Sequence, residues 1–251
     1  MSKALKAERV RAQGLPAGFE RPLLVSYQRL PGPGFMAKLM SMLLPYMILI
    51  FSLLGAMYPA IDLGAGEKER GTLETLLSAP VERQALVMGK FGVVLAASVV
   101  SALLATASLY VSIKAGALGK FAPEQVSFGP GEAIAAFAVV IPTACIFSSL
   151  LMVLSVFARS FKEAQSYASP LQMFIILPAF VSFIPGLELS PATALVPVMN
   201  VSLALKAIFT GELGMHVLDI ALLLASSVVL AGVLLWFAAR WFLREQVLFR
   251  S

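Results

Sequence analysis

Charge is what this sequence has least of. Asp, Glu, Lys and Arg make up only 13% of its 251 residues, against 59% that are hydrophobic, whereas soluble domains are about a quarter charged. Cysteine and histidine each occur once. The lone Cys145 excludes an intrachain disulfide framework, and the lone His216 excludes a metal site that needs paired histidines. The chain is therefore not a typical soluble domain, a disulfide-stabilised protein or a protein with a paired-histidine metal site.

The apolar residues gather in five long runs that contain no Asp, Glu, Lys or Arg. A helix of about 20 apolar residues crosses a hydrocarbon core about 30 Å thick. The sequence therefore predicts an all-α polytopic membrane protein, with a transmembrane domain over residues 36–251. The five predicted spans lie at about 39–61, 86–113, 133–158, 164–186 and 217–239.

The second run carries a stripe of small residues. Ala97, Ser101 and Ala105 recur at every fourth position. Because small side chains let two helix backbones come close, we predict that another helix packs against this face.

Basic residues are divided unevenly between the loops. Nine lie in the loops 62–90 and 159–163 and in the C-terminal tail, and three lie in the loops between them. Because Lys and Arg accumulate on the cytoplasmic side, we predict a cell (inner) membrane protein with a cytoplasmic C-terminus. The same bias, with anionic headgroups of the lipid bilayer, explains the net charge of +5, so we expect no nucleic-acid partner.

Residues 1–38 run against this rule. Five spans with a cytoplasmic C-terminus place them outside the cell, yet they carry seven basic residues. Long translocated segments escape the charge bias, so we interpret residues 1–35 as the remnant of an extracytoplasmic region with a linker, in a truncated or split product. The alternative is that residues 39–61 do not cross the membrane simply.

The densest cluster of charge, AGEKERGTLETLLSAPVER (65–83), interrupts the apolar runs. Gly64 and Gly66 are expected to loosen the chain as it leaves the bilayer. Thr72 is the predicted N-cap of a short two-faced helix, and Pro80 fits the first turn of the next helix. The apolar face comprises Leu73, Leu76 and Leu77, and Glu74 lies on another face. Such a helix either passes force from a partner to two spans or rests passively in the lipid interface.

Three stretches, YPAIDLGAGEKERGTLETLLSAPVER (58–83), RSFKEAQSYASPL (159–171) and ALVPVMNVSLALKAIFTGE (194–212), carry a resemblance. In order, spacing and hydropathy they resemble permeases of the ABC type-2 family, in particular its NatB-like, sodium-extrusion branch, over about residues 22–251. The resemblance implies that the chain matches the C-terminal part of such a permease, without the first span and most of the extracytoplasmic domain.

The resemblance further implies the partners. The chain would pair with a second permease copy, in a homo- or heterodimer, and with cytoplasmic ABC ATPase subunits. ATP and Mg²⁺ would be bound there and not by this chain, which has no G-x-x-x-x-G-K-[ST] loop. The loop 62–85 would hold a coupling helix that docks on the ATPase. Its expected contact residues are Glu67, Glu69, Arg70, Gly71, Thr72, Leu73, Glu74, Leu76 and Leu77.

Two further motifs, Lys162–Glu163 and the segment 189–211, each allow two interpretations. Lys162 and Glu163 either make a second contact to the ATPase or the coupling helix, or start an interfacial helix with Lys162 reaching to headgroups. The segment 189–211, with Pro197 and Asn200, either forms a re-entrant hairpin at the outer end of the pathway, or is a loop whose Asn200 caps a helix over 201–209.

The function favoured by these observations is the permease subunit of an ABC exporter, which is not itself an enzyme. A non-transporting membrane scaffold coupled to an ATPase is the alternative. An intramembrane enzyme is disfavoured, because His216 has no obvious serine partner. The five charge-free runs contain no acidic residue, and Asp62 and Asp219 stand only at span ends, so the sequence does not identify the transported substrate.

Overall fold

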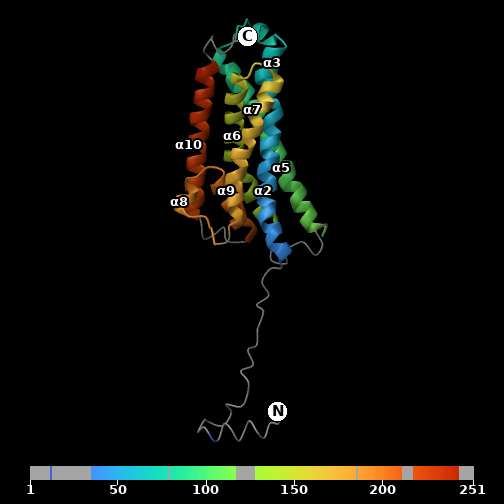
Figure 1. Ribbon diagram of the computed structural model, residues 1–251, viewed down its shortest axis with the longest axis vertical. Coiled ribbons are helices and arrows are strands. Elements are labelled where there is room, and N and C mark those ends of the chain that lie inside the picture. Colours follow the sequence, from blue (N-terminus) through green and yellow to red (C-terminus); the bar gives the residue numbers. More distant parts are fainter. Residues whose placement is uncertain are drawn as a thin grey trace. The chain divides into compact units, whose positions relative to one another are not determined.

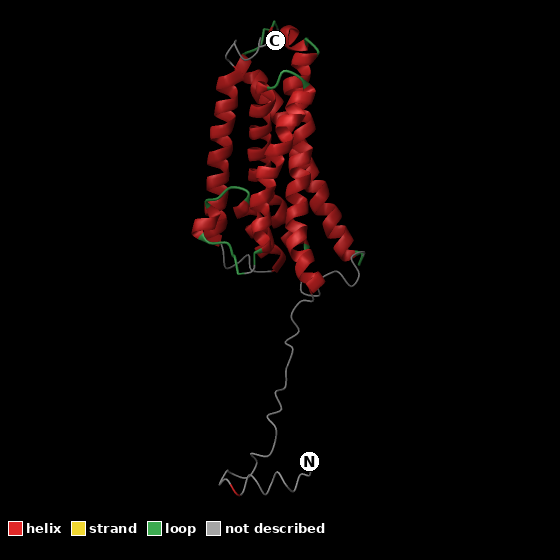
Figure 2. Ribbon diagram, viewed as in Figure 1, coloured by secondary structure: helices red, strands yellow, loops and turns green. Residues whose placement is uncertain are grey.

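The computed structural model describes residue 12 and residues 35–78, 80–116, 128–184, 186–210 and 217–242. The chain divides into two units, residues 1–32 and 33–251, and only the second is treated below. The predicted extracytoplasmic remnant, residues 1–35, lies almost wholly outside the described residues. Every regular element in the described part of the second unit is a helix (Figures 1 and 2).

The long helices lie side by side in a bundle (Figure 1). The first, α2 (Phe35–Ile61), continues through a π-helical turn, η1 (Asp62–Gly66), into the short α3 (Glu67–Glu69). The other elements are α4 (Thr72–Leu77), α5 (Arg83–Lys114), α6 (Pro130–Phe157), α7 (Phe161–Ala179), the 3-10 turn η3 (Phe180–Phe183), α8 (Pro191–Ala194), α9 (Met199–Thr210) and α10 (Val217–Phe242).

Four segments of the described chain are long and apolar enough to cross a membrane. They are Leu43–Glu69, Gln84–Lys114, Pro130–Phe157 and Val217–Trp241, which confirms the prediction of an all-helical polytopic membrane protein. The fifth predicted span, 164–186, corresponds to α7 and η3. The α-helix there ends at Ala179, just after Pro178, so a fifth crossing stays a prediction.

The core is built around α6, which packs against α2, α5, α9 and α10. Its buried side chains include Phe147, Leu151 and Met152, and a helix that is apolar all round is typically buried. Phe128, just before α6, stacks on Phe209 of α9 with ring centroids 4.6 Å apart. The long helices therefore enclose α6 and hold the short α9 beside it.

Helices α2 and α5 meet at a close approach. A Cβ atom at Gly55 would overlap the side chain of Ser101. One turn away, the Ser98 hydroxyl donates to the Ser52 carbonyl at 2.8 Å. The predicted close approach is confirmed at Ala97 and Ser101, and α2 is the helix that makes it. Ala105 instead lines an opening between the two helices.

We expect Gly55→Ala to lower the free energy of unfolding by about 1–3 kcal/mol, the usual effect of overpacking. The added methyl group has to displace Ser101 or separate α2 from α5. The matched control is Gly92→Ala on α5, which is exposed and has open space around it. Thermal denaturation of both purified variants tests the expectation, and equal melting temperatures would contradict it.

Three local expectations at the charged insert are wrong. Gly64 and Gly66 do not loosen the chain but are buried in η1, where a Cβ atom at Gly64 would overlap Ser155 of α6. Thr72 is the first residue of α4 and not its N-cap, since its hydroxyl donates to the Glu67 carbonyl at 3.2 Å. Pro80 precedes α5, which begins at Arg83 with Glu82 before it.

Candidate functional site

The charged segment folds against one end of the bundle. There α3 lies beside the ends of other helices, and α8 lies at the opposite end (Figure 1). The last turn of α10 is also at the α3 end, because Trp241 packs on Phe157 at the end of α6, with centroids 4.7 Å apart. Since π-helical turns such as η1 are frequent at functional sites, this end is the candidate site.

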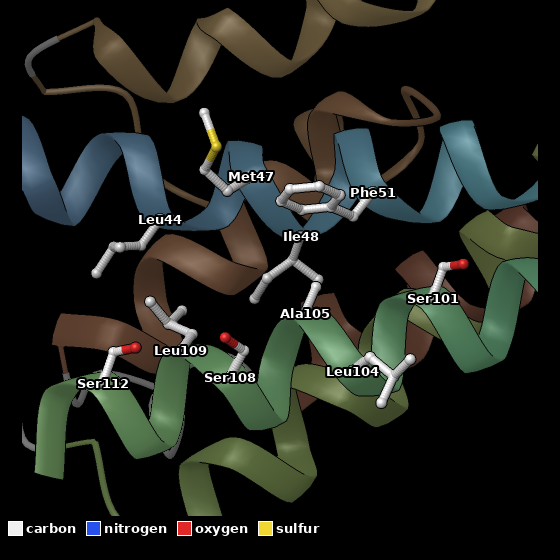
Figure 3. Close-up of a pocket in the computed structure, with 10 residues that line it drawn as sticks. All are labelled: Leu44, Met47, Ile48, Phe51, Ser101, Leu104, Ala105, Ser108, Leu109 and Ser112. Carbon is white, nitrogen blue, oxygen red and sulfur yellow. The ribbon is translucent and has the colours of Figure 1, made fainter. Parts of the chain in front are cut away.

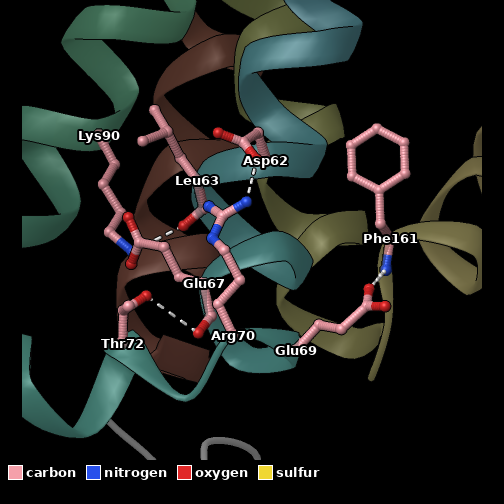
Figure 4. A network of polar contacts seen from close by, with 8 residues as sticks. All are labelled: Asp62, Leu63, Glu67, Glu69, Arg70, Thr72, Lys90 and Phe161. Carbon is pink, nitrogen blue, oxygen red and sulfur yellow. Dashed lines mark hydrogen bonds and ion pairs between the residues drawn. The ribbon is translucent and has the colours of Figure 1, made fainter.

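The segment is first held by contacts within itself (Figure 4). Arg70 Nη1 lies 2.8 Å from Asp62 Oδ1, and both side chains are about half exposed. This hydrogen bond raises the pKa of the Arg70 guanidinium. Gly71 then takes a positive φ of 69°, which glycine adopts without strain. The chain therefore turns sharply between α3 and α4, at Arg70 and Gly71.

A nearly buried ion pair joins α3 to α5. The Lys90 ammonium pairs with the Glu67 carboxylate and donates to the Leu63 carbonyl at 2.7 Å (Figure 4). The side chains of Lys90 and Glu67 are only 6% and 15% exposed. Sequence reasoning did not select Lys90 as a site residue, although a lysine inside a predicted span is itself a signal that a partner is needed.

Glu69 and Lys68 reach the corner between α6 and α7. Glu69 Oε2 accepts the backbone N–H of Phe161 at 2.7 Å (Figure 4). The Lys68 ammonium donates to the carbonyls of Val156 and Ala158. Four of the contact residues predicted for the coupling helix, Glu67, Glu69, Arg70 and Thr72, thus have side-chain partners within the chain. Lys68 is a site residue that the sequence analysis does not select.

The first turn of α7 caps itself. The Ser160 hydroxyl accepts the N–H of Glu163 at 3.2 Å, and Glu163 accepts the N–H of Arg159 at 2.7 Å. The Tyr167 hydroxyl donates to Glu163 at 2.5 Å. That bond, followed by the one from Arg159, lowers the pKa of Glu163, so its capping contribution is lost when the pH falls through that lowered value. Lys162 is exposed.

The helix α4 lies outermost, packed on α3. Thr72 and Thr75 are exposed and Leu76 is half-buried, while the side chains of Leu73, Glu74 and Leu77 lie outside the described residues. Two large apolar side chains that follow α4 in the chain are exposed, Val81 at 58% and Met88, in the first turns of α5, at 50%. We call Leu76, Val81 and Met88 the α4 surface. Exposed apolar side chains close in sequence to charged residues are typical of a protein–protein contact.

At the opposite end, Asn200 ties three helices together. It is fully buried in the first turn of α9, where its Nδ2 donates to the Ala194 carbonyl at 3.0 Å. Its Oδ1 accepts the N–H of Val201 at 2.7 Å, and Ser226 of α10 donates to the same Ala194 carbonyl at 3.0 Å. Asn200 therefore stands inside its helix, not before it, and Pro197 lies half-buried in the turn that precedes it.

A cleft of about 500 Å³ lies between α2 and α5 (Figure 3). Its lining residues are Leu44, Met47, Ile48, Phe51, Ser101, Leu104, Ala105, Ser108, Leu109 and Ser112. No charged side chain lines it, so it suits apolar groups better than ions. In the part of the chain that the structure describes, no three His, Cys, Asp or Glu side chains come together to hold a metal ion. His216 lies outside that part, and Asp219 is in the first turn of α10.

These features identify the class of protein, and a comparison with known families identifies its family. Long apolar helices with a charged insert folded onto one end are those of a polytopic membrane protein. The chain belongs to the ABC-2 transporter family, since the family model described as "ABC-2 family transporter protein" matches residues 4–247. This confirms the family that the three sequence stretches indicate.

A curated relative agrees with the family. The chain is 30% identical over 219 residues to the ABC transporter permease protein NatB of Bacillus subtilis (strain 168). The match covers 85% of this chain and 55% of NatB, so the chain spans about half the length of the relative. No solved structure matches the chain.

Proposed function

We propose that this chain is the transmembrane permease subunit of an ABC exporter, driven by a separate cytoplasmic ATPase that docks on α4. The observation that carries the proposal is the charged insert, whose α3 is bonded to the ends of three long helices while α4 lies outermost. A partner that pushes on α4 acts through α3 on several spans. The family membership and the likeness to a permease support the same conclusion.

The α4 surface suits the docking. Val81 and Met88 are large, apolar and at least half exposed at the end of the bundle where the charges gather. Apolar side chains that are buried in a partner's groove, with charges at the rim, are the usual anatomy of such interfaces. In this arrangement the ATPase holds ATP and Mg²⁺, and the α3 end of the bundle, with the C-terminus, faces the cytoplasm.

A second permease copy completes the transporter in this proposal. Exposed apolar side chains run along α5 and α10, including Val93, Leu104, Val228 and Val233. In the bilayer such faces meet either lipid or another helix. The sides of α5 and α10 therefore provide room for a second copy without displacing α6 from the core.

The segment from α8 to α9 serves as a re-entrant hairpin at the outer end. The 12 residues of α9 extend about 18 Å, which is too short to cross a core of about 30 Å. The turn between the two helices contains Val198 with a φ of 68°. Irregular backbone of this kind is tolerated at membrane depth only where protein buries it, and Asn200 and Ser226 satisfy the Ala194 carbonyl there.

Co-purification with ABC ATPases tests the docking. We expect Leu76→Asp and Glu74→Lys each to reduce the ATPase recovered with the chain about tenfold or more, as hot-spot substitutions do. Leu76→Asp places a charge on the α4 surface, and Glu74→Lys reverses the charge of α4. The matched control is Glu188→Lys, which reverses an exposed charge before α8 at the opposite end and should leave recovery unchanged.

Transport is tested in vesicles that contain the complex. Vectorial movement of a solute that depends on ATP supports the exporter. Intact ATPase binding without such movement favours the scaffold alternative. Wild-type recovery of the ATPase with both α4 variants would overturn the assignment of α4 as the coupling helix.

A further inference from the structure

Three consecutive residues of α3 bond to three different helices. Glu67 pairs with Lys90 of α5, Lys68 donates to carbonyls at the end of α6, and Glu69 accepts an N–H at the start of α7. Figure 4 shows the first and third of these contacts converging on α3. A single helical turn is thus tied to three of the long helices, and α2 leads into it without a break.

Lys68 completes the end of α6. The last carbonyls of a helix have no partner within it, and a cation beside them is favourable because of the helix dipole. The Lys68 ammonium donates to Val156 and, at 3.4 Å, to Ala158. Ala158 is itself fully buried. These carbonyls are therefore satisfied by a side chain that comes from the coupling segment.

Glu69 completes the start of α7. The first N–H groups of a helix are also unpaired, and a carboxylate there is favoured by the dipole. Phe161 is the first residue of α7, and its N–H reaches Glu69 Oε2 at 2.7 Å. Only the residues from Ala158 to Ser160 separate the two helices. Lys68 and Glu69 therefore hold the α6–α7 corner from its two sides.

We propose that Lys68 and Glu69 are positioning residues that pass the movement of α4 to the α6–α7 corner, without touching the ATPase. Their charged groups are engaged at the corner, and charge-assisted bonds of this kind are about twice as strong as neutral ones. Only the turn at Arg70 and Gly71 separates α3 from α4, so a displacement of α4 is passed directly to these bonds. The inference rests on the proposed function, because the ATPase supplies the movement.

The experiment uses hydrogen exchange in the complex of the full chain with its co-purifying ATPase. Exchange of the amides in 158–164 is measured by mass spectrometry with and without Mg²⁺ and a non-hydrolysable ATP analogue. In the wild type we expect the analogue to change this exchange about 5-fold or more, the range of typical allosteric couplings. Lys68→Met and Glu69→Ala should abolish the change while the ATPase stays bound.

Conservative and distant variants serve as controls. Glu69→Gln should restore the response, because its amide oxygen can accept the same N–H of Phe161. Lys114→Met and Glu188→Ala remove exposed charges away from the corner and should respond as the wild type does. Without nucleotide, Glu69→Ala should already exchange its Phe161 amide faster. If Lys68→Met does not fold, the comparison of Glu69→Ala with Glu69→Gln decides alone.

The outcomes separate the two proposals. Loss of ATPase binding in Glu69→Ala would make Glu69 a direct contact and overturn the positioning role. A wild-type response to nucleotide in Glu69→Ala would overturn it as well. If the wild-type chain binds no ABC ATPase, both the proposed function and the transmission fail. If the wild-type complex forms and the Glu69→Ala complex responds to nucleotide as the wild type does, only the positioning role fails.

Discussion

Lys90→Met should lower the free energy of unfolding by about 3–5 kcal/mol, the usual result of removing one partner of a buried ion pair. The methionine keeps the length of the side chain but leaves the Glu67 carboxylate, 15% exposed, without its cation. It also removes the donor to the Leu63 carbonyl. Denaturant titration of the purified protein in mixed micelles measures the change.

Two variants decide whether the loss comes from the ion pair. The double variant Lys90→Met with Glu67→Leu removes both charges, and replacing a buried pair by apolar groups is often close to neutral. We therefore expect it to recover most of the stability. Lys114→Met, at the exposed end of the same helix, should cost little. Equal stability of Lys90→Met and Lys114→Met would show that Lys90 is not buried against α3.

The sequence predicts the long helices well because their signal is local. The predicted spans at 86–113, 133–158 and 217–239 become α5, α6 and α10 with ends that differ by at most three residues. The exception is the end of the fourth run, where Pro178 is followed by a 3-10 turn. The apolar run continues beyond Ala179, where the α-helix ends, so hydropathy alone places the end of this helix too late.

The site is predictable only in part because its bonds are not local. The charged insert and the short helix from Thr72 are visible in the sequence as one short stretch. The sequence does not show which partner each charged side chain of the insert contacts. The acceptors of Lys68 lie 88 and 90 residues away, and the donor to Glu69 lies 92 residues away. Gly64 shows the same limit, since only Ser155 of α6 makes it a packing position.

Asn200→Asp should destabilise the protein by about 3–5 kcal/mol, as an uncompensated buried charge does. The two side chains have the same shape, so the change isolates the charge and the lost donor. Asn200 is fully buried, and its Nδ2 donates to the Ala194 carbonyl. A carboxylate oxygen of the Asn200→Asp variant would face the Ala194 carbonyl oxygen, and neither atom could donate a hydrogen bond. The same denaturant titration measures the loss.

Ser226→Ala is the matched control, because it removes the other donor to the Ala194 carbonyl and introduces no charge. We expect it to cost about 1 kcal/mol, the net value of one hydrogen bond. A large difference between the two variants supports a hairpin that is sealed from water by α9 and α10. If Asn200→Asp is as stable as Ser226→Ala, water reaches the turn between α8 and α9. In that case the segment forms part of an open aqueous path and does not close its outer end.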